Sequence, residues 1–174
     1  MRRIIYYKCV RRSVLTAILL FLAALAGCYR GSRPARIGTS APDFIVKDGN
    51  QTVTLSQLHG QVVVLNFWAT WCAPCVEEMP SLVTMSQKMR PKGVTVLGVS
   101  VDADEDAYRR FVKDHGVTFL TVRDADQKSN SLYGTVKFPE TYIIDRNGVV
   151  RRKFIGPVDW NSPEVVDYLN KLSS

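Results

Sequence analysis

The sequence predicts an α/β domain in which a mixed β-sheet is covered by helices on both faces. Two near-continuous apolar runs, residues 62–68 and 94–101, are typical of strands buried on both sides. A helical pattern follows each run, as expected when crossovers join parallel strands. Residues 141–154 form two strand-like stretches around an Asn-Gly pair, which predicts an antiparallel hairpin. Parallel and antiparallel pairs together make the sheet mixed.

The domain is predicted to open with a short hairpin, the first buried strand and a long helix. Residues 43–55 carry two short apolar stretches around Asp-Gly-Asn, which is a hairpin signal. After the strand of residues 62–68, residues 73–89 have a helical pattern. The apolar residues predicted to lie roughly on one face of this helix are Val76, Met79, Val83 and Met89.

The later elements follow from charge, glycine and proline signals. Residues 104–116 predict a helix with acids in its first turn, cations later and glycine at its end. A short strand at 119–122 and a short helix at 127–133 are expected next. The Asn-Gly pair in residues 141–154 predicts a type I′ turn. Residues 162–172 predict a closing helix with proline at its first position.

Residues 1–27 are predicted to be a signal peptide. A positively charged stretch leads into a short apolar run, as in signal peptides, and the run is shorter than the ~20 residues of a spanning helix. The run ends in Leu-Ala-Gly-Cys, which resembles a bacterial lipobox, so Cys28 is the expected lipidation site. An ordinary signal peptide or an uncleaved anchor is the alternative. Residues 28–36 predict a flexible tether, and residues 37–174 the folded domain.

The charge of the chain is concentrated at its start. Of 23 basic residues, five precede residue 28 and no acidic residue does, which leaves 18 basic against 16 acidic residues. Near neutrality in the remainder argues against nucleic-acid binding.

Only Cys72 and Cys75 remain once the signal segment and Cys28 are set aside. A zinc site needs about four ligands, and neither His59 nor His115 stands in a ligand spacing with the pair, so no metal is expected. A disulfide between cysteines three apart closes too small a loop to act as a structural staple. A reactive dithiol is the remaining interpretation.

The local sequence suits a reactive dithiol. A buried strand ends just before the pair and a helix begins near Cys72, with Pro74 in the first turn, where its missing N–H costs nothing. Free N–H groups at a helix start favour a thiolate, which predicts Cys72 as the nucleophile. Cys75 lies one turn deeper and is predicted to be the resolving thiol.

The segment Val-Val-Val-Leu-Asn-Phe-Trp-Ala-Thr-Trp-Cys-Ala-Pro-Cys (residues 62–75) resembles the active-site segment of the thioredoxin superfamily, closest to the TlpA/ResA-like group. The resemblance extends over residues 37–172 and implies a thioredoxin fold with an added N-terminal β-hairpin. It also implies that Phe138 and Pro139 form the cis-proline loop that docks substrate. A strand-entry proline is the alternative for Pro139.

One position departs from thioredoxin itself. Thioredoxin carries an acid in the strand before its cysteines, and Asn66 stands there in this chain. The TlpA/ResA-like group has a glutamate three residues after the second cysteine, which matches Glu78 and implies a catalytic role; a helix-start charge is the alternative. Asn66 is interpreted as a satisfied buried amide. Trp71 is expected either to shape the docking surface or to cover the core.

The resemblance implies a membrane-tethered, extracytoplasmic thiol-disulfide oxidoreductase. We expect it to reduce protein disulfides, for example the haem-binding cysteines of apocytochromes c, and to be recharged by a membrane thiol carrier of the CcdA/DsbD type. No dissociable cofactor is implied, because the Cys72–Cys75 disulfide carries the electrons, and a monomer is expected. The expected location is the periplasm or the outer face of the cytoplasmic membrane, with Cys28 as the anchor.

Two other classes of protein share features with this sequence. A peroxiredoxin shares the opening segments but needs Pro-x-x-x-Thr-x-x-Cys, and Leu65 and Ala69 stand at the proline and threonine positions before Cys72. A copper-binding carrier of the Sco type has a Cys-x-x-x-Cys spacing and a distal histidine, for which His115 is the nearest candidate. The spacing in this chain is Cys-x-x-Cys, which favours the oxidoreductase.

Overall fold

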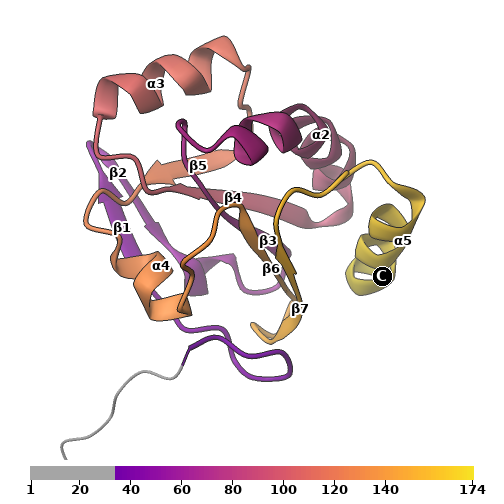
Figure 1. Ribbon diagram of the computed structural model, residues 1–174. Coiled ribbons are helices and arrows are strands. Elements are labelled where there is room, and N and C mark those ends of the chain that lie inside the picture. The colour runs from indigo at the N-terminus through magenta and orange to yellow at the C-terminus, as the bar shows by residue number, and fades with distance from the viewer. Residues whose placement is uncertain (1–33) are drawn as a thin grey trace, which may run out of the picture. The chain divides into compact units, whose positions relative to one another are not determined.

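The computed structural model describes residues 34–174, which fold around a five-stranded mixed sheet (Figure 1). The strand order is β5-β4-β3-β6-β7, and β1 and β2 form a separate two-stranded sheet. The strands are β1 (Ile45–Asp48), β2 (Gln51–Thr54), β3 (Val62–Trp68), β4 (Val94–Ser100), β5 (Leu120–Arg123), β6 (Glu140–Ile144) and β7 (Val150–Ile155). The helices are η1 (Leu55–Leu58), α2 (Ala73–Met89), η2 (Arg90–Lys92), α3 (Glu105–Asp114), α4 (Lys128–Tyr133) and α5 (Pro163–Ser173).

The central strand β3 joins the parallel and antiparallel halves of the sheet. It pairs with β4 in parallel and with β6 in antiparallel register, and all seven of its residues are buried. This burial explains its uninterrupted apolar sequence, because a strand covered on both faces has no polar side. The predicted α/β fold with a mixed sheet and an added N-terminal hairpin is therefore confirmed.

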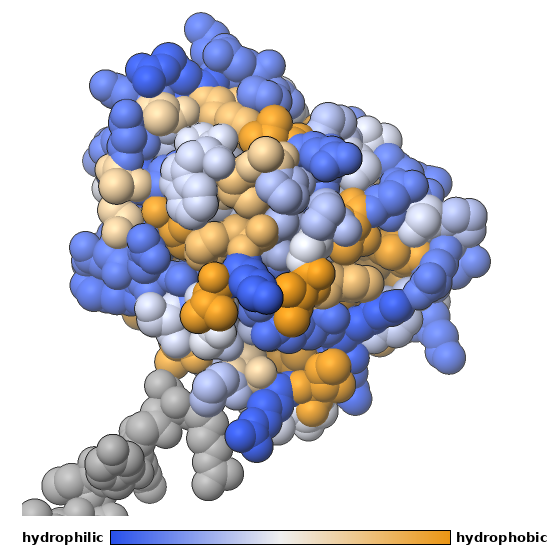
Figure 2. All heavy atoms as spheres, in the orientation of Figure 1, coloured by the Kyte–Doolittle hydropathy of each residue, from blue (hydrophilic) through white to orange (hydrophobic). Residues whose placement is uncertain are grey.

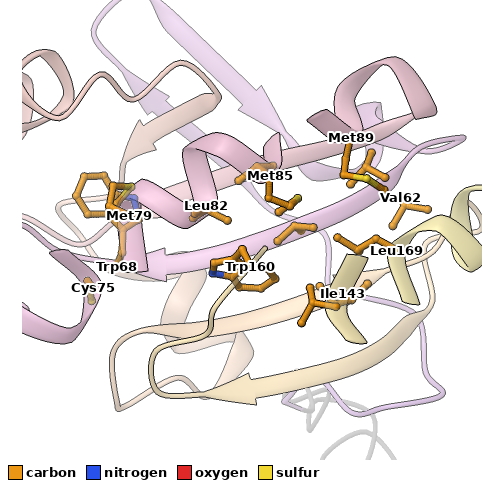
Figure 3. Close-up of a cluster of buried hydrophobic side chains, with 14 of the residues drawn as sticks. Val62, Trp68, Cys75, Met79, Leu82, Met85, Met89, Ile143, Trp160 and Leu169 are labelled. Carbon is orange, nitrogen blue, oxygen red and sulfur yellow. The ribbon is translucent and has the colours of Figure 1, made fainter. Parts of the chain in front are cut away.

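Two hydrophobic layers cover the sheet. One holds side chains of α2, α3 and α5, and Figure 3 shows several of them meeting β3 and β6 around Trp160. The other layer lies under the β1–β2 hairpin and α4, with Phe44, Val53 and Tyr133 against the sheet. Since α2 and α3 are successive crossovers running in one direction along the sheet, both lie on the same face.

One local prediction is wrong. The turn between β6 and β7 is not type I′, because only Gly148 has a positive φ (76°) and Asn147 does not. The Asp145 carboxylate accepts the N–H groups of Asn147 and Val149 (both 2.9 Å), and this local bonding favours a different turn.

The four apolar residues predicted to share one face of α2 all meet the same core cluster. Met79 and Met89 are buried in it, and Val76 and Val83 are partly buried against it. The buried face also includes Cys75, Glu78 and Met85, which the apolar pattern did not indicate.

Candidate active site

The two cysteines lie at the start of α2, one turn apart. β3 ends at Trp68, and α2 begins at Ala73 with Cys72 as its N-cap in an extended conformation. The pair forms a disulfide with its Cα atoms 5.2 Å apart. The predicted strand end and helix start thus bring Cys72 and Cys75 together.

The two sulfurs differ in their surroundings. Cys72 retains 7% exposure, whereas Cys75 is fully buried. The backbone N–H of Cys75 donates to Cys72 Sγ at 3.3 Å, and Pro74 adds no N–H of its own to the first turn. In the reduced protein, these helix-start N–H groups favour negative charge on the sulfur of Cys72 rather than on that of Cys75.

A buried carboxylate fixes the loop that leads to the cysteines. Asp102, just beyond β4, accepts the backbone N–H of Thr70 (3.0 Å), the Thr70 hydroxyl (2.7 Å) and the Ser100 hydroxyl (2.6 Å). The loop before Cys72 is therefore tied to the end of the neighbouring strand. Sequence reasoning assigned no role to Asp102, although it lies within residues 37–172, over which the family resemblance extends.

Of the expected docking residues, Trp71 and the Phe138–Pro139 pair lie on two loops that touch, and Pro74 lies in the first turn of α2. The Phe138–Pro139 peptide bond is cis, and the Pro139 carbonyl accepts the N–H of Gly156 at 2.9 Å. Phe138 meets Trp71 edge to face with ring centroids 6.0 Å apart, and Trp71 is 64% exposed. Trp71 therefore does not cover the core. Pro74 is exposed as well.

The face that carries these loops is mixed in character. Figure 2 shows apolar residues gathered across its middle, over the start of α2 and the segment between α4 and β6, with hydrophilic residues around them. Val136, in that segment, is 84% exposed. An exposed apolar area of this kind beside a reactive group suits contact with another molecule.

A second buried carboxylate supports the cis-proline loop from behind. Glu140 follows Pro139 and accepts hydrogen bonds from the hydroxyls of Thr135 (2.6 Å) and Tyr142 (2.5 Å). The ammonium of Lys153 lies 3.0 Å from the same oxygen. Thr135 and Glu140 thus link the two ends of the loop. Sequence reasoning did not single out Glu140, because an acid in a strand gives no signal of its partners.

Glu78 lies on the buried side of α2, one turn beyond Cys75, and is 3% exposed. Its Oε1 accepts Asn66 Nδ2–H (2.8 Å), and its Oε2 accepts the Val158 N–H (3.0 Å) and the Trp160 Nε1–H (3.3 Å). Burial raises the pKa of Glu78 to about 7, against the lowering effect of these three donors. The carboxyl therefore titrates near neutral pH.

The Glu78 carboxylate is hydrogen bonded to these three donors and not to a cysteine sulfur. Among residues 34–174, no hydrogen bond joins its carboxylate to Cys72 or Cys75. Val158 and Trp160 were missed by sequence reasoning, because contacts across some 80 residues leave no local pattern. Asn66 is only half satisfied: its Nδ2 is bonded, whereas its Oδ1 accepts no hydrogen bond from the described part of the chain.

Other sequence expectations fall outside this cluster. The predicted signal peptide and lipidation site at Cys28 lie outside the described residues. His115 stacks on Phe111, with ring centroids 3.8 Å apart. In the described residues, no group of three or more His, Cys, Asp or Glu side chains could hold a metal ion. Within the same range, no helix is both long enough and apolar enough to span a membrane.

Comparisons with known proteins agree with this site. The AhpC/TSA family model matches residues 37–153. The chain is 34% identical to the thiol-disulfide oxidoreductase ResA of Bacillus thuringiensis (strain Al Hakam), over 90% of this chain and 93% of that protein. It is 32% identical to ResA of Bacillus subtilis (strain 168), over 93% of each.

A solved structure from Chlorobium tepidum, of a protein assigned as a thiol:disulfide interchange protein DsbE, is also similar. It superposes with a TM-score of 0.69 at 32% identity, covering 79% of this chain and 95% of that one. The disulfide at the start of α2, the fold around it and these relatives lead to one assignment. The chain belongs to the ResA-like thiol-disulfide oxidoreductases of the AhpC/TSA family.

Proposed function

We propose that this oxidoreductase works as a reductant of protein disulfides outside the cytoplasm, with the haem-binding cysteines of apocytochromes c as one substrate. The observation that carries the proposal is the asymmetry of the two sulfurs at the start of α2. Cys72 is the N-cap and keeps some exposure, whereas Cys75 is fully buried. An incoming disulfide therefore meets Cys72 first.

The proposed reaction is a two-step thiol–disulfide exchange. The Cys72 thiolate attacks one substrate sulfur, forming a mixed disulfide and releasing the other substrate sulfur as a thiolate. Cys75 then loses its proton and attacks Cys72, which releases the second substrate thiolate. The substrate gains two electrons and two protons, and the protein is left with the Cys72–Cys75 disulfide. No dissociable cofactor takes part.

Glu78 is proposed to hold the proton that leaves Cys75. Support comes from its place one turn beyond Cys75 and from burial, which raises its pKa to about 7. A group that titrates near the working pH can both accept and return a proton. The carboxyl would act through a short rearrangement or one water, since its oxygens face Asn66, Val158 and Trp160.

Substrate docking is proposed for the loops on either side of the disulfide. Trp71 and Pro74 flank Cys72 and are exposed, and Phe138 and Pro139 stand on the facing loop. An extended substrate segment would lie across Trp71 and Phe138, which present ring surface at low conformational cost. The protein is expected to act as a monomer.

Recharging and location complete the proposal. A membrane thiol carrier of the CcdA/DsbD type would return electrons to the Cys72–Cys75 disulfide. Cys28 would carry the lipid that holds the domain at the membrane, and residues 29–36 would serve as its tether. Mass spectrometry of protein extracted from membranes should then show an acylated Cys28 as the first residue; a soluble form that begins further along the chain would reject the anchor.

The nucleophile assignment has a direct test. The Cys75→Ser variant cannot resolve the mixed disulfide, so a covalent adduct with a Cys-x-x-Cys-His peptide should accumulate through Cys72. The Cys72→Ser variant is the matched control and should trap little. Adduct formation only in Cys72→Ser would reverse the roles. The reduction potential of the pair, measured against glutathione, tests the direction, and a potential as high as that of a strong oxidant would contradict a reductant.

A further inference from the structure

The side chain of Asn66 lies between Glu78 and Thr141, in the middle of the sheet. Its Nδ2 donates to Glu78 Oε1 at 2.8 Å and to Thr141 Oγ1 at 2.9 Å. The side chain is fully buried, and its Oδ1 accepts no hydrogen bond from residues 34–174. A buried amide with both donors used and an idle acceptor is uncommon, because an unmade buried bond is costly.

The partners of Glu78, as oriented in this structure, offer no acceptor for a proton on the carboxyl. Asn66, Val158 and Trp160 all present N–H groups to the carboxylate. A protonated carboxyl is itself a donor and needs an acceptor. Oε2 already accepts two N–H bonds, so a proton fits better on Oε1, where it would face the N–H of Asn66 and find no acceptor.

We propose that Asn66 is a positioning residue whose side-chain amide flips when Glu78 takes up a proton. In the flipped orientation, Asn66 Oδ1 accepts the new Oε1–H of Glu78. The proton comes from solvent or from the Cys75 thiol and ends on Oε1; no other covalent bond changes. The Thr141 hydroxyl follows, because it accepts from Nδ2 in one state and donates to Oδ1 in the other. Val158 and Trp160 keep their bonds to Oε2 in both states.

The amide flip costs little free energy, because neither orientation of Asn66 satisfies all of its hydrogen-bonding groups. With Glu78 charged, the idle group is Oδ1; with Glu78 protonated, it is Nδ2. The exchange replaces one unpaired group by another while keeping the bonds to Glu78 and Thr141. An aspartate at this position would place a second carboxylate against Glu78, and leucine would serve neither state.

The groups that face the carboxyl are few. Its hydrogen-bond partners are Asn66 from β3 and Val158 and Trp160 from the segment between β7 and α5, and none of them carries a charge. Thr141 from β6 contacts the Asn66 amide and is also uncharged. Along the helix, the adjacent Glu77 is exposed, whereas Glu78 is buried, and Cys75 lies one turn before Glu78. The inference rests on the proposed relay role of Glu78 only for its kinetic consequence, and the titration can be measured without it.

The first experiment follows the wild-type protein by NMR, oxidised so that the cysteines do not titrate. The Asn66 side-chain amide resonances should move with the same midpoint as the carboxyl carbon of Glu78. Contacts between the Asn66 amide hydrogens and Thr141 should be present at high pH and lost at low pH. The indole N–H of Trp160 should stay hydrogen bonded throughout. Amide–Thr141 contacts that persist after Glu78 is protonated would overturn the proposal.

The second experiment compares two donors to the same carboxylate. Trp160 only donates, so Trp160→Phe should raise the pKa of Glu78, by roughly a tenfold change in its acid dissociation constant. Asn66→Leu should change that constant by less, because Asn66 serves both protonation states. Asn130→Leu, which removes another buried amide with an idle Oδ1 far from Glu78 in the sequence, should leave it unchanged.

A one-way donor would behave differently. The Asn66 bond is the shorter of the two, 2.8 against 3.3 Å, so a mere donor would give Asn66→Leu the larger effect. A larger effect of Asn66→Leu than of Trp160→Phe would therefore refute the amide flip. The Glu78→Gln variant separates this inference from the proposed relay. If that variant exchanges disulfides at the wild-type rate, while the Asn66 amide of the wild-type protein still follows the titration of Glu78, the relay role fails and the amide flip stands.

Discussion

The buried carboxyl of Glu78 makes the stability of the oxidised protein depend on pH. Burial raises its pKa from the ordinary value of 4.5 to about 7, so the folded state holds the proton more tightly than the unfolded state does. The resulting stabilisation is fully present below the unfolded pKa. It is lost as the pH rises through the folded pKa, because the folded state must then bury a charge.

The size of the effect follows from the shift. A rise from 4.5 to about 7 in the pKa of one group is worth about 3 kcal/mol in the free energy of unfolding. The wild-type protein should therefore lose that amount between roughly pH 4.5 and pH 7.5 from this residue alone. Three hydrogen bonds to the carboxylate are already included in this net figure, since each of them lowers the pKa.

The Glu78→Gln variant isolates the contribution of this carboxyl to the free energy of unfolding. Glutamine is neutral at every pH and has nearly the shape of the protonated acid, with its carbonyl able to accept from Val158 and Trp160. The free energy of unfolding, from urea titrations of the oxidised proteins at pH 5 to 8, should rise in the variant relative to wild type by about 2.5 kcal/mol across that window, since part of the wild-type loss has already occurred at pH 5. The other ionisable side chains are the same in both proteins, so their contributions cancel in the difference.

The difference between the two curves is the decisive quantity. If the variant and the wild type run parallel from pH 5 to 8, the carboxyl of Glu78 is not perturbed and the argument from burial fails. A difference that falls with rising pH would mean that the three donors outweigh burial. Equal slopes of unfolding free energy against urea concentration in both proteins would show that the denatured state is not the cause.

Three further outcomes follow from the site. Glu78→Gln should slow disulfide exchange near neutral pH, by up to about 10²-fold if proton transfer limits the rate; stopped-flow rates equal to wild type from pH 5 to 10 would remove the residue from the mechanism. Trp71→Ala should raise KM for a protein substrate about tenfold while the rate with a small disulfide stays the same; an equal loss with both would point to damage at the cysteines. Asp102→Ala leaves the Thr70 N–H and hydroxyl without their acceptor and should destabilise the protein by about 3 kcal/mol in urea titrations; a loss below 1 kcal/mol would mean that the hydrogen bonds of Asp102 contribute little to stability.

Much of the scaffold could be predicted from local patterns. β3 and α2 have the bounds read from the sequence, because an apolar run ends where the cysteines begin and Pro74 marks a helix start. Cys72 and Cys75 needed only their spacing and this context. Pro139 was placed opposite them by family resemblance, and the structure has its peptide bond in the cis form.

What could not be predicted depends on contacts between distant segments. Nothing near Trp160 in the sequence indicates that its indole meets Glu78, and the inward direction of Glu78 contradicts the usual exposure of a glutamate on a helix. The turn at Gly148 was misjudged because Asn-Gly usually signals type I′, whereas the Asp145 carboxylate organises this one through its own hydrogen bonds.

The chain before β3 has a consequence for how this enzyme meets unfolded polypeptides. Gly38 and Thr39 hydrogen bond to both backbone groups of Val150 on the edge strand β7, and Asp48 accepts the backbone N–H of Arg123 on the opposite edge strand β5. Unpaired strand edges recruit extended segments regardless of their sequence. The N-terminal residues occupy backbone groups at both edges of the sheet, so the addition of a substrate segment as an extra strand becomes less favourable. Substrate recognition is then confined to the face that carries the two cysteines.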